Sequence, residues 1–258
     1  MKPALCLLLS LGLSLCLHAR KQSYPTAYLY SYPQTVIATA KAPAAWSNAD
    51  WMKTAGIVGI GAGLYLIDYE IQRFSLDNRN SFSADISIAA KQFGEGKYIL
   101  PAIAVTTIGG KIFHSDKTTD TGLLCLKSFL LSNGATQILK ALSQRERPEA
   151  NRGKQFFNGS GYRKSRESFP SGHATVAWSV APILAEQYKD NSLITPLVYS
   201  IATLTSISRV HDNKHWASDA FIGSVIGYLG AQMCLKTTPR LQVLPNADLQ
   251  GLSFSWDW

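Results

Sequence analysis

Two side chains in the last third of the chain have the spacing of an oriented nucleophile. His215 and Asp219 are separated by four residues, so they lie on one face of the segment if it is helical. The carboxylate can then accept a hydrogen bond from one imidazole nitrogen, which leaves the other nitrogen free to attack. Because such a pair by itself is more often a surface ion pair, the interpretation depends on what else lies nearby.

Five further residues predict a phosphate site. Lys140, Arg147 and Arg209 supply positive charge, and guanidinium groups match the geometry of phosphate oxygens. Ser171 and Gly172 follow a proline at an expected helix start, where exposed backbone N–H groups favour anions. Ser171 can cap this helix, and Gly172 lets the backbone approach an oxygen closely.

A second histidine, His173, is placed to protonate a departing alkoxide, and we expect it to act as the general acid. We interpret His211 and His114 as structural or exposed. The segment between Lys140 and Glu167 holds eight basic and three acidic residues, which is +5 of the net charge of +8. Its loop cations are expected to attract anionic substrates or headgroups: Lys154, Arg163, Lys164 and Arg166.

These residues must be brought together by helices. Apolar periodicity predicts six helices and a weaker amphipathic piece near 83–93. The expected bounds are about 52–72, 97–113, 119–143, 171–188, 193–209 and 216–235. If the helices pack antiparallel, the ends of the third and fifth meet the starts of the fourth and sixth. We therefore expect an all-α, six-helix antiparallel bundle with its site at one end, in a helical domain over 52–236.

The two ends of the chain differ from this pattern. Residues 1–19 have a leucine-rich apolar run followed by basic residues, which predicts an export signal. Residues 20–51 are rich in Tyr, Pro and Ala without helical periodicity and are expected to be extended. The tail 237–258 alternates large apolar with small or polar residues near its end, so we expect a short β-hairpin there.

Composition limits the function without deciding it. The 258 residues fit one domain, and 46% apolar with 16% charged residues suits either a soluble or a membrane protein. The basic residues cluster beside the phosphate motifs, so we expect no nucleic acid partner. No Cys/His spacing predicts a metal site, and Cys125 and Cys234 fall in apolar helical segments as expected for buried thiols.

Together the motifs resemble a known signature. Lys140-x6-Arg147-Pro148, Pro170-Ser171-Gly172-His173 and Ser208-Arg209-x5-His215-x3-Asp219 are similar to the three-part signature of the type 2 phosphatidic acid phosphatase and vanadium haloperoxidase superfamily. The resemblance covers 119–235. It implies that the cations, the Ser171 hydroxyl and the Gly172 amide hold the phosphoryl group, with His215 as nucleophile, Asp219 as its orienter and His173 as acid.

The expected function is metal-independent hydrolysis of a phosphomonoester or a lipid (pyro)phosphate through a phosphohistidine on His215. Phosphatidate-like membrane lipids are the favoured substrates, and a soluble-substrate acid phosphatase is the second reading. The alternative from another class is a haloperoxidase, for which vanadate would be the cofactor; otherwise no cofactor is expected. We expect an exported protein of the cell envelope that faces the periplasm and associates with the membrane surface.

Overall fold

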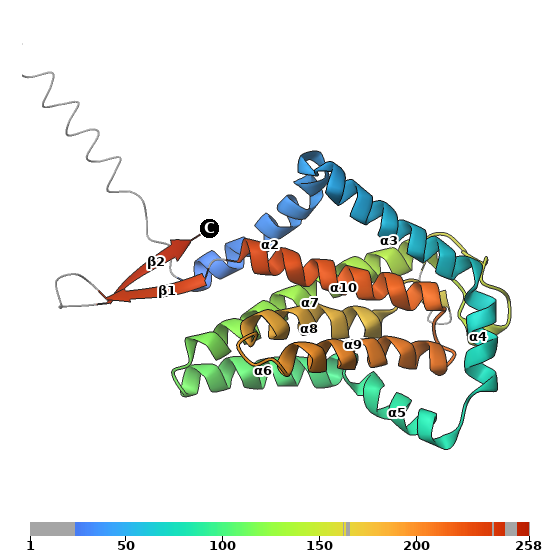
Figure 1. The fold of residues 1–258 in the computed structure, drawn as a ribbon. Helices are drawn as coiled ribbons and strands as arrows, with labels where there is room; N and C mark the ends of the chain where they lie inside the picture. Colours follow the sequence, from blue (N-terminus) through green and yellow to red (C-terminus); the bar gives the residue numbers. More distant parts are fainter. Residues whose placement is uncertain (1–23, 162, 164–165, 239, 246–251, 258) are drawn as a thin grey trace, which may run out of the picture.

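The computed structural model describes residues 24–161, 163, 166–238, 240–245 and 252–257. A bundle of antiparallel helices forms the centre of the molecule, and further helices cover one side and one end (Figure 1). The helices of the bundle are α6 (Gly96–Ile112), α7 (Asp116–Ser143), α8 (Gly172–Gln187), α9 (Ile194–His211) and α10 (Ala217–Thr237). Apart from two short strands near the C-terminus, the described elements are helices, which confirms the predicted all-α class.

Helix α8 lies at the centre of the bundle and packs against α7, α9 and α10. The core around it joins apolar side chains of α6, α7, α8 and α10: Ile103, Leu124, Phe129, Val176, Ile183 and Ala231. Two glycines of α10 allow α8 to approach closely. A Cβ atom at Gly223 would lie 2.4 Å from the carbonyl oxygen of Ser171, and one at Gly227 would lie 2.4 Å from that of Thr175. The start of α8 is therefore held directly against α10.

The expectation of an extended segment over 20–51 is wrong for most of its length. Residues Tyr24–Lys41 form helix α2, and a short 3-10 helix, Ala42–Ala45, follows. The buried face of α2 carries small and hydroxyl-bearing residues, so no apolar stripe marks it in the sequence. Tyr28 donates to the carbonyl of Leu123 at 2.8 Å, and Ser31 accepts from the buried Lys127 ammonium at 2.8 Å. Polar contacts hold this helix to the bundle.

The predicted helix over 52–72 is two helices that meet at Ile67. These are α3 (Asn48–Leu66) and α4 (Asp68–Asp77), and α5 (Ser81–Gln92) corresponds to the weak amphipathic piece. Helix α4 crosses the end of the bundle and α5 packs against α9 (Figure 1). The architecture thus contains α2 and α4 in addition to the six helices and the weaker amphipathic piece that were expected. The break at Ile67 allows Asp68 to turn into the bundle end, where it becomes fully buried.

At the C-terminal end, β1 (Arg240–Pro245) and β2 (Leu252–Asp257) pair antiparallel, with Arg240 opposite Asp257 and Pro245 opposite Leu252. The predicted export signal over 1–19 lies outside the described residues. Among the helices that the structure describes, none combines the length and the hydropathy needed to cross a membrane.

Candidate active site

The residues singled out in the sequence come together at one end of the bundle. Helices α7 and α9 end there and α8 and α10 begin there, as the antiparallel arrangement predicts (Figure 1). The loops between them add Ser168 and His215, and α4 adds Asp68. The site is therefore built from helix ends, where unpaired backbone N–H groups and side chains of several elements converge.

His215 is buried and its tautomer is determined by the backbone. Its Nδ1 lies 2.6 Å from the carbonyl oxygen of Ser168. A carbonyl only accepts, so Nδ1 carries the proton and Nε2 keeps its lone pair. Burial, followed by the charges of Lys140, Arg147 and Arg209, holds the pKa of His215 well below its usual value. The imidazole is consequently neutral at pH 7, which is the form that can attack.

The predicted hydrogen bond between Asp219 and the His215 imidazole is wrong. Helix α10 begins at Ala217, so His215 precedes it and the i, i+4 geometry of a helix does not apply. The Asp219 carboxylate instead accepts from the Ser168 hydroxyl at 2.5 Å and from the Trp216 amide at 3.1 Å. Asp219 therefore reaches His215 only through Ser168, whose hydroxyl it binds and whose carbonyl holds the ring.

A buried ion cluster that the sequence analysis missed supports this arrangement. Arg145, which is 1% exposed, donates to Asp219 at 2.5 Å and to Asp68 at 2.8 Å. The Ser218 hydroxyl donates to Asp68 at 2.6 Å. Burial raises the pKa of Asp219, and the charge of Arg145 opposes that rise. The sequence signal was the carboxylate of Asp68 near the end of an apolar helical segment, but its partners Arg145 and Ser218 lie 77 and 150 residues away.

The three predicted cations lie near His215, since the charge of each lowers the pKa of its imidazole. Lys140 donates to the Glu167 carbonyl at 2.5 Å, and burial followed by the charge of Arg147 lowers its pKa to about 8. The Nε atoms of Arg147 and Arg209 are buried without a hydrogen-bond partner among the described residues. Unpaired buried guanidinium donors are costly, so they indicate a site built to hold an anion.

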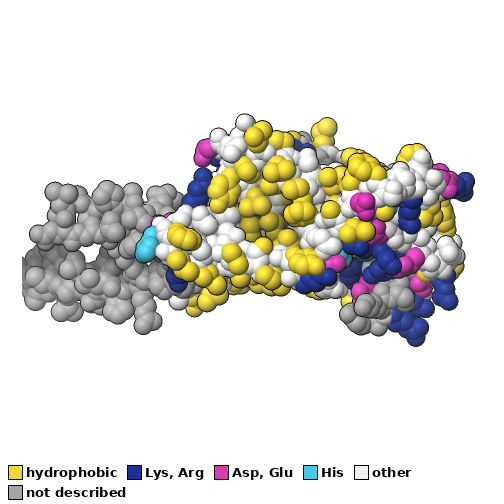
Figure 2. Space-filling model, turned by 90° about the horizontal axis from the view of Figure 1, so that it is seen from below, with side chains coloured by type: hydrophobic (Ala, Val, Ile, Leu, Met, Phe, Trp, Pro, Cys, Tyr) yellow, Lys and Arg dark blue, Asp and Glu magenta, His cyan; other side chains and the backbone are white. Residues whose placement is uncertain are grey.

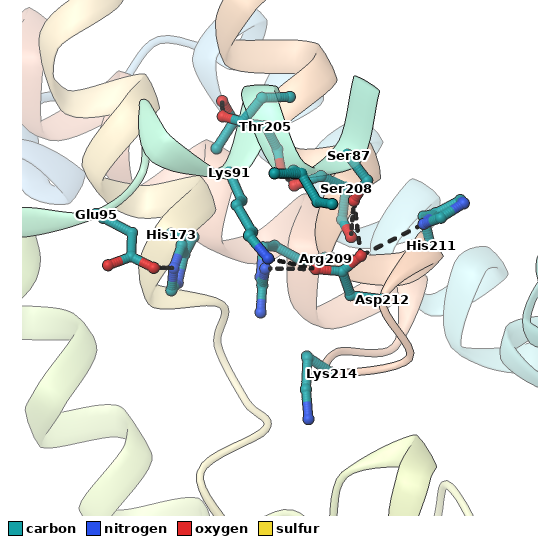
Figure 3. Close-up of polar contacts among 12 residues, drawn as sticks. Ser87, Lys91, Glu95, His173, Thr205, Ser208, Arg209, His211, Asp212 and Lys214 are labelled. Atoms are coloured by element: carbon teal, nitrogen blue, oxygen red, sulfur yellow. Dashed lines mark hydrogen bonds and ion pairs between the residues drawn. The ribbon is translucent and has the colours of Figure 1, made fainter. Parts of the chain in front are cut away.

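In two of these three cations, Arg209 and Arg147, a neighbouring carboxylate contacts a terminal nitrogen of the guanidinium. Arg209 lies 3.2 Å from Asp212, which also accepts from Ser87 at 2.7 Å (Figure 3). Arg147 lies 3.9 Å from Glu149. In each arginine the carboxylate contacts a terminal nitrogen and leaves Nε for a ligand.

The start of α8 supplies the remaining predicted residues. Ser171 is the N-cap of α8, and its hydroxyl accepts from the Ala174 amide at 3.5 Å. Gly172 lies beside Lys140, whose Cε would be 3.7 Å from a Cβ at this position. His173 follows, and burial together with the charge of Arg209 lowers its pKa to about 4. The free site therefore holds His173 neutral.

The expectation that all loop cations are available to ligands needs correction. Arg166 donates its Nε to Glu146 at 3.0 Å, and Lys154 lies over the rings of Tyr65 and Tyr69 and donates to the Leu66 carbonyl. The Arg166 ion pair joins two parts of the loop between α7 and α8, and Lys154 holds this loop against α3 and α4. Arg163 is exposed, and Lys164 lies outside the described residues.

In the part of the chain that the structure describes, no three His, Cys, Asp or Glu side chains are grouped so as to hold a metal ion. Cys125 and Cys234 are buried free thiols, as expected.

Comparisons with known proteins show what this chain is similar to. The sequence model of the PAP2 superfamily matches residues 121–242. The lipid A 1-phosphatase of Porphyromonas gingivalis is 36% identical over 67 residues, which are 26% of this chain but only 15% of that protein. The phosphatidylglycerophosphatase B of Bacillus subtilis is 28% identical over 170 residues, which cover 63% of this chain and 78% of that protein.

Among solved structures, the transmembrane PAP2 type phosphatidylglycerolphosphate phosphatase from Bacillus subtilis has the same fold. The TM-score is 0.53 at 24% identity, with 81% of this chain and 94% of that chain covered. Residues 121–242 thus match the PAP2 superfamily, which confirms the predicted resemblance. Both curated relatives are phosphatases, in agreement with the predicted enzyme class, a phosphoric monoester hydrolase.

Proposed function

We propose that the protein is a metal-independent phosphatase that hydrolyses a lipid phosphate through a phosphohistidine on His215. The observation that carries the proposal is the state of His215 itself. Its Nδ1 proton is bound by the Ser168 carbonyl, its pKa is lowered, and its environment is positively charged. A neutral imidazole with a free Nε2 lone pair beside unpaired arginine donors is suited to attack a bound phosphate.

In the first step, His215 Nε2 attacks phosphorus and an N–P bond forms as the P–O bond to the leaving group breaks. Lys140, Arg147 and Arg209 neutralise charge on the phosphoryl oxygens, together with the Ser171 hydroxyl and the Gly172 amide. In the second step, water attacks phosphorus, the N–P bond breaks, and inorganic phosphate leaves. His215 returns to its neutral form with the Nδ1 proton in place.

His173 handles the proton in both steps. It is neutral in the free site, because burial and Arg209 lower its pKa to about 4. A bound phosphate adds negative charge beside the ring and raises this pKa, so the imidazole can take up a proton and pass it to the leaving oxygen. The neutral ring then accepts a proton from the attacking water and becomes an imidazolium again. When inorganic phosphate leaves, the pKa falls back, and the ring releases this proton to solvent and returns to its neutral form.

An apolar groove beside the site supports a lipid substrate. The groove, of about 230 Å³, is lined by α6, α7, α8 and α9, and its lining includes Phe93, Ile99, Ala102, Ala177, Ala181 and Ile201. Ala177 lies one helical turn below His173, so the groove begins directly beneath the site. The transfer of hydrocarbon from water to such a surface is favourable. Two relatives are named for lipid phosphates, lipid A and phosphatidylglycerophosphate.

The outer surface supports a location at the membrane. Figure 2 shows hydrophobic side chains spread over the face seen from below, with charged side chains gathered toward the end that carries the site. Helices α6 and α9 carry several exposed apolar residues: Val105, Ile108, Ile112, Leu197 and Leu204. We propose a protein of the cell envelope, exported and associated with the membrane, whose site faces outward. Carbonate extraction of membranes, with a periplasm-dependent reporter fused after Lys41, tests both parts.

The function is tested by phosphate release from lipid and soluble substrates. Wild-type protein in detergent is expected to release phosphate from phosphatidate or a lipid diphosphate, unaffected by a chelator and inhibited by vanadate, which mimics pentacoordinate phosphorus. His215→Asn is expected to remove this activity while circular dichroism stays unchanged. If a chelator inactivates the protein and added metal restores the activity, the proposed mechanism is wrong. If the protein instead oxidises halide in the presence of vanadate and peroxide, it is a haloperoxidase and the proposed reaction is wrong.

A second comparison separates the two histidines by the basicity of the leaving group. His173→Asn is expected to lower kcat/KM for an alkyl phosphate by about 10²–10⁴, the range typical of proton transfer, and much less for p-nitrophenyl phosphate. His215→Asn should lower both equally, since a nucleophile is needed whatever departs. Equal losses in His173→Asn would withdraw the assignment of His173 as the acid.

A further inference from the structure

The turn between α5 and α6 is pressed against His173. A Cβ atom at Gly94 would lie 2.6 Å from the carbonyl oxygen of His173 and 2.8 Å from its Cβ. The same atom would lie 2.8 Å from Cγ2 of Thr205, so the turn fits between α8 and α9 only because residue 94 has no side chain. Thr205 also donates its hydroxyl to the Ala90 carbonyl at 2.8 Å, which anchors the end of α5. The turn between α5 and α6 is therefore held tightly against His173 on one side of the site.

The next residue, Glu95, presents its carboxylate to the His173 ring. Its Oε1 lies 3.6 Å from Nε2 of His173, and Figure 3 shows the two side chains directed toward one another. Its other oxygen, Oε2, lies 2.8 Å from the ammonium of Lys97. Lys97 thus holds one carboxylate oxygen and leaves the other facing the imidazole.

We propose that Glu95 is a positioning residue for the general acid: it orients the His173 ring with Nε2 toward the carboxylate and Nδ1 toward the leaving oxygen, and it stabilises the imidazolium. The proposal rests on the proposed function of His173. In the reaction, Nδ1 gives its proton to the leaving oxygen as the P–O bond breaks, and Glu95 remains ionised throughout.

The charges around His173 show why such a carboxylate is needed. Arg209 of α9 and Lys140 of α7 both disfavour a proton on the ring, and burial adds to their effect. Glu95, in the turn before α6, acts in the opposite direction. Its own pKa is lowered, first by Lys97 and then by His173, so it is ionised wherever the enzyme works. Without Glu95, the bound phosphate would have to offset burial and the charges of Arg209 and Lys140.

The test uses Glu95→Gln in the full chain, with Glu186→Gln on the exposed end of α8 as the matched control. For an alkyl phosphate, Glu95→Gln is expected to lower kcat/KM by at least about tenfold, a part of what a proton-transfer group supplies. For p-nitrophenyl phosphate the change should be small. The alkaline limb of the kcat profile should move to lower pH, because the imidazolium is less stable. Glu95→Asp should recover part of the loss.

A double variant distinguishes positioning from a structural role. If Glu95 acts through His173, then Glu95→Gln added to His173→Asn causes no further loss on the alkyl phosphate. Equal losses on both substrates, or a further loss in the double variant, would overturn the inference. Binding of inorganic phosphate, measured by calorimetry, should stay within about twofold of wild type if the site is intact. A wild-type protein without phosphatase activity would instead overturn the proposed function.

Discussion

The backbone carbonyl of Ser168 and Nδ1 of His215 lie 2.6 Å apart, so the loop before α8 holds the proposed nucleophile. The same residue binds Asp219 through its hydroxyl at 2.5 Å. Ser168 therefore couples the imidazole to the buried carboxylate with two different groups. The orientation of the nucleophile depends on where this loop is placed, and Asp219 acts on the loop.

Replacing Ser168 by alanine keeps the carbonyl contact and removes the link to Asp219. We expect Ser168→Ala to lower kcat by roughly tenfold with KM little changed, and to cost about 1–3 kcal/mol of stability because Asp219 loses a buried donor. Ser179→Ala, which removes a buried hydroxyl bound within α8, is the control and should keep its kcat. Steady-state kinetics and urea unfolding give both quantities. An unchanged kcat in Ser168→Ala would show that Asp219 does not act through this residue.

The ion cluster of Asp68, Arg145 and Asp219 should dominate the stability of the bundle end. Asp68→Ala leaves the guanidinium of Arg145 buried with one partner fewer, and we expect a loss of about 3–5 kcal/mol in the free energy of unfolding. Asp190→Asn removes an exposed carboxylate that lies 3.5 Å from Lys117 and should have no measurable effect. Both are read from denaturant unfolding in the same detergent. A loss under about 1 kcal/mol for Asp68→Ala would contradict the assignment.

The close approach of α8 and α10 predicts a strong effect of one methyl group. In Gly223→Ala, the new Cβ meets the carbonyl oxygen of Ser171 at 2.4 Å, so the start of α8 must shift. We expect a lower melting temperature. We also expect a higher KM, because the shift moves Ser171 and Gly172 away from the bound phosphate. Gly134→Ala in α7 meets no atom within 4 Å and should be neutral or stabilising. Similar behaviour of the two variants would show that the contact is not tight in solution.

Stability should fall on the acid side because His173 is buried in its neutral form. Its pKa is about 4 in the folded protein, lowered first by burial, against about 6.5 in an unfolded chain. Between these values only the unfolded chain takes up the proton, so unfolding becomes easier as pH falls from about 6.5 to 4. His215 contributes in the same direction. The melting temperature of His173→Asn should decline less steeply over this range than that of the exposed control His114→Asn.

Phosphate binding should weaken on the alkaline side because Lys140 loses its charge. Burial, followed by Arg147, lowers its pKa to about 8, and the ammonium is present only below that value. We expect KM to rise above about pH 8 while kcat changes less. Lys140→Arg should move this rise to higher pH, since guanidinium stays charged. A KM independent of pH up to 10 in the wild type would place Lys140 outside the phosphate site.

The types and spacing of the signature residues already identified most of the site. Helix periodicity is local, and antiparallel packing brings the ends of α7 and α9 to the starts of α8 and α10. Lys140, Arg147, Arg209, His173 and His215 could therefore be assigned to one place before any contact was known. The roles assigned to them remain predictions. Helix α2 escaped this reasoning because its buried face is made of hydroxyl and small side chains rather than apolar ones.

Tertiary structure alone decided which groups hold these side chains. The partner of His215 is the backbone carbonyl of Ser168. Every residue carries a backbone carbonyl, so no residue type in the sequence could identify this partner. Arg145 contacts Asp68, which lies 77 residues before it in the sequence, and Glu95 contacts His173, which lies 78 residues after it. Such contacts depend on how the helices α4, α6, α8 and α10 cross at the end of the bundle. Their spacing along the chain follows no local period, and only the packed helices bring the charges within reach.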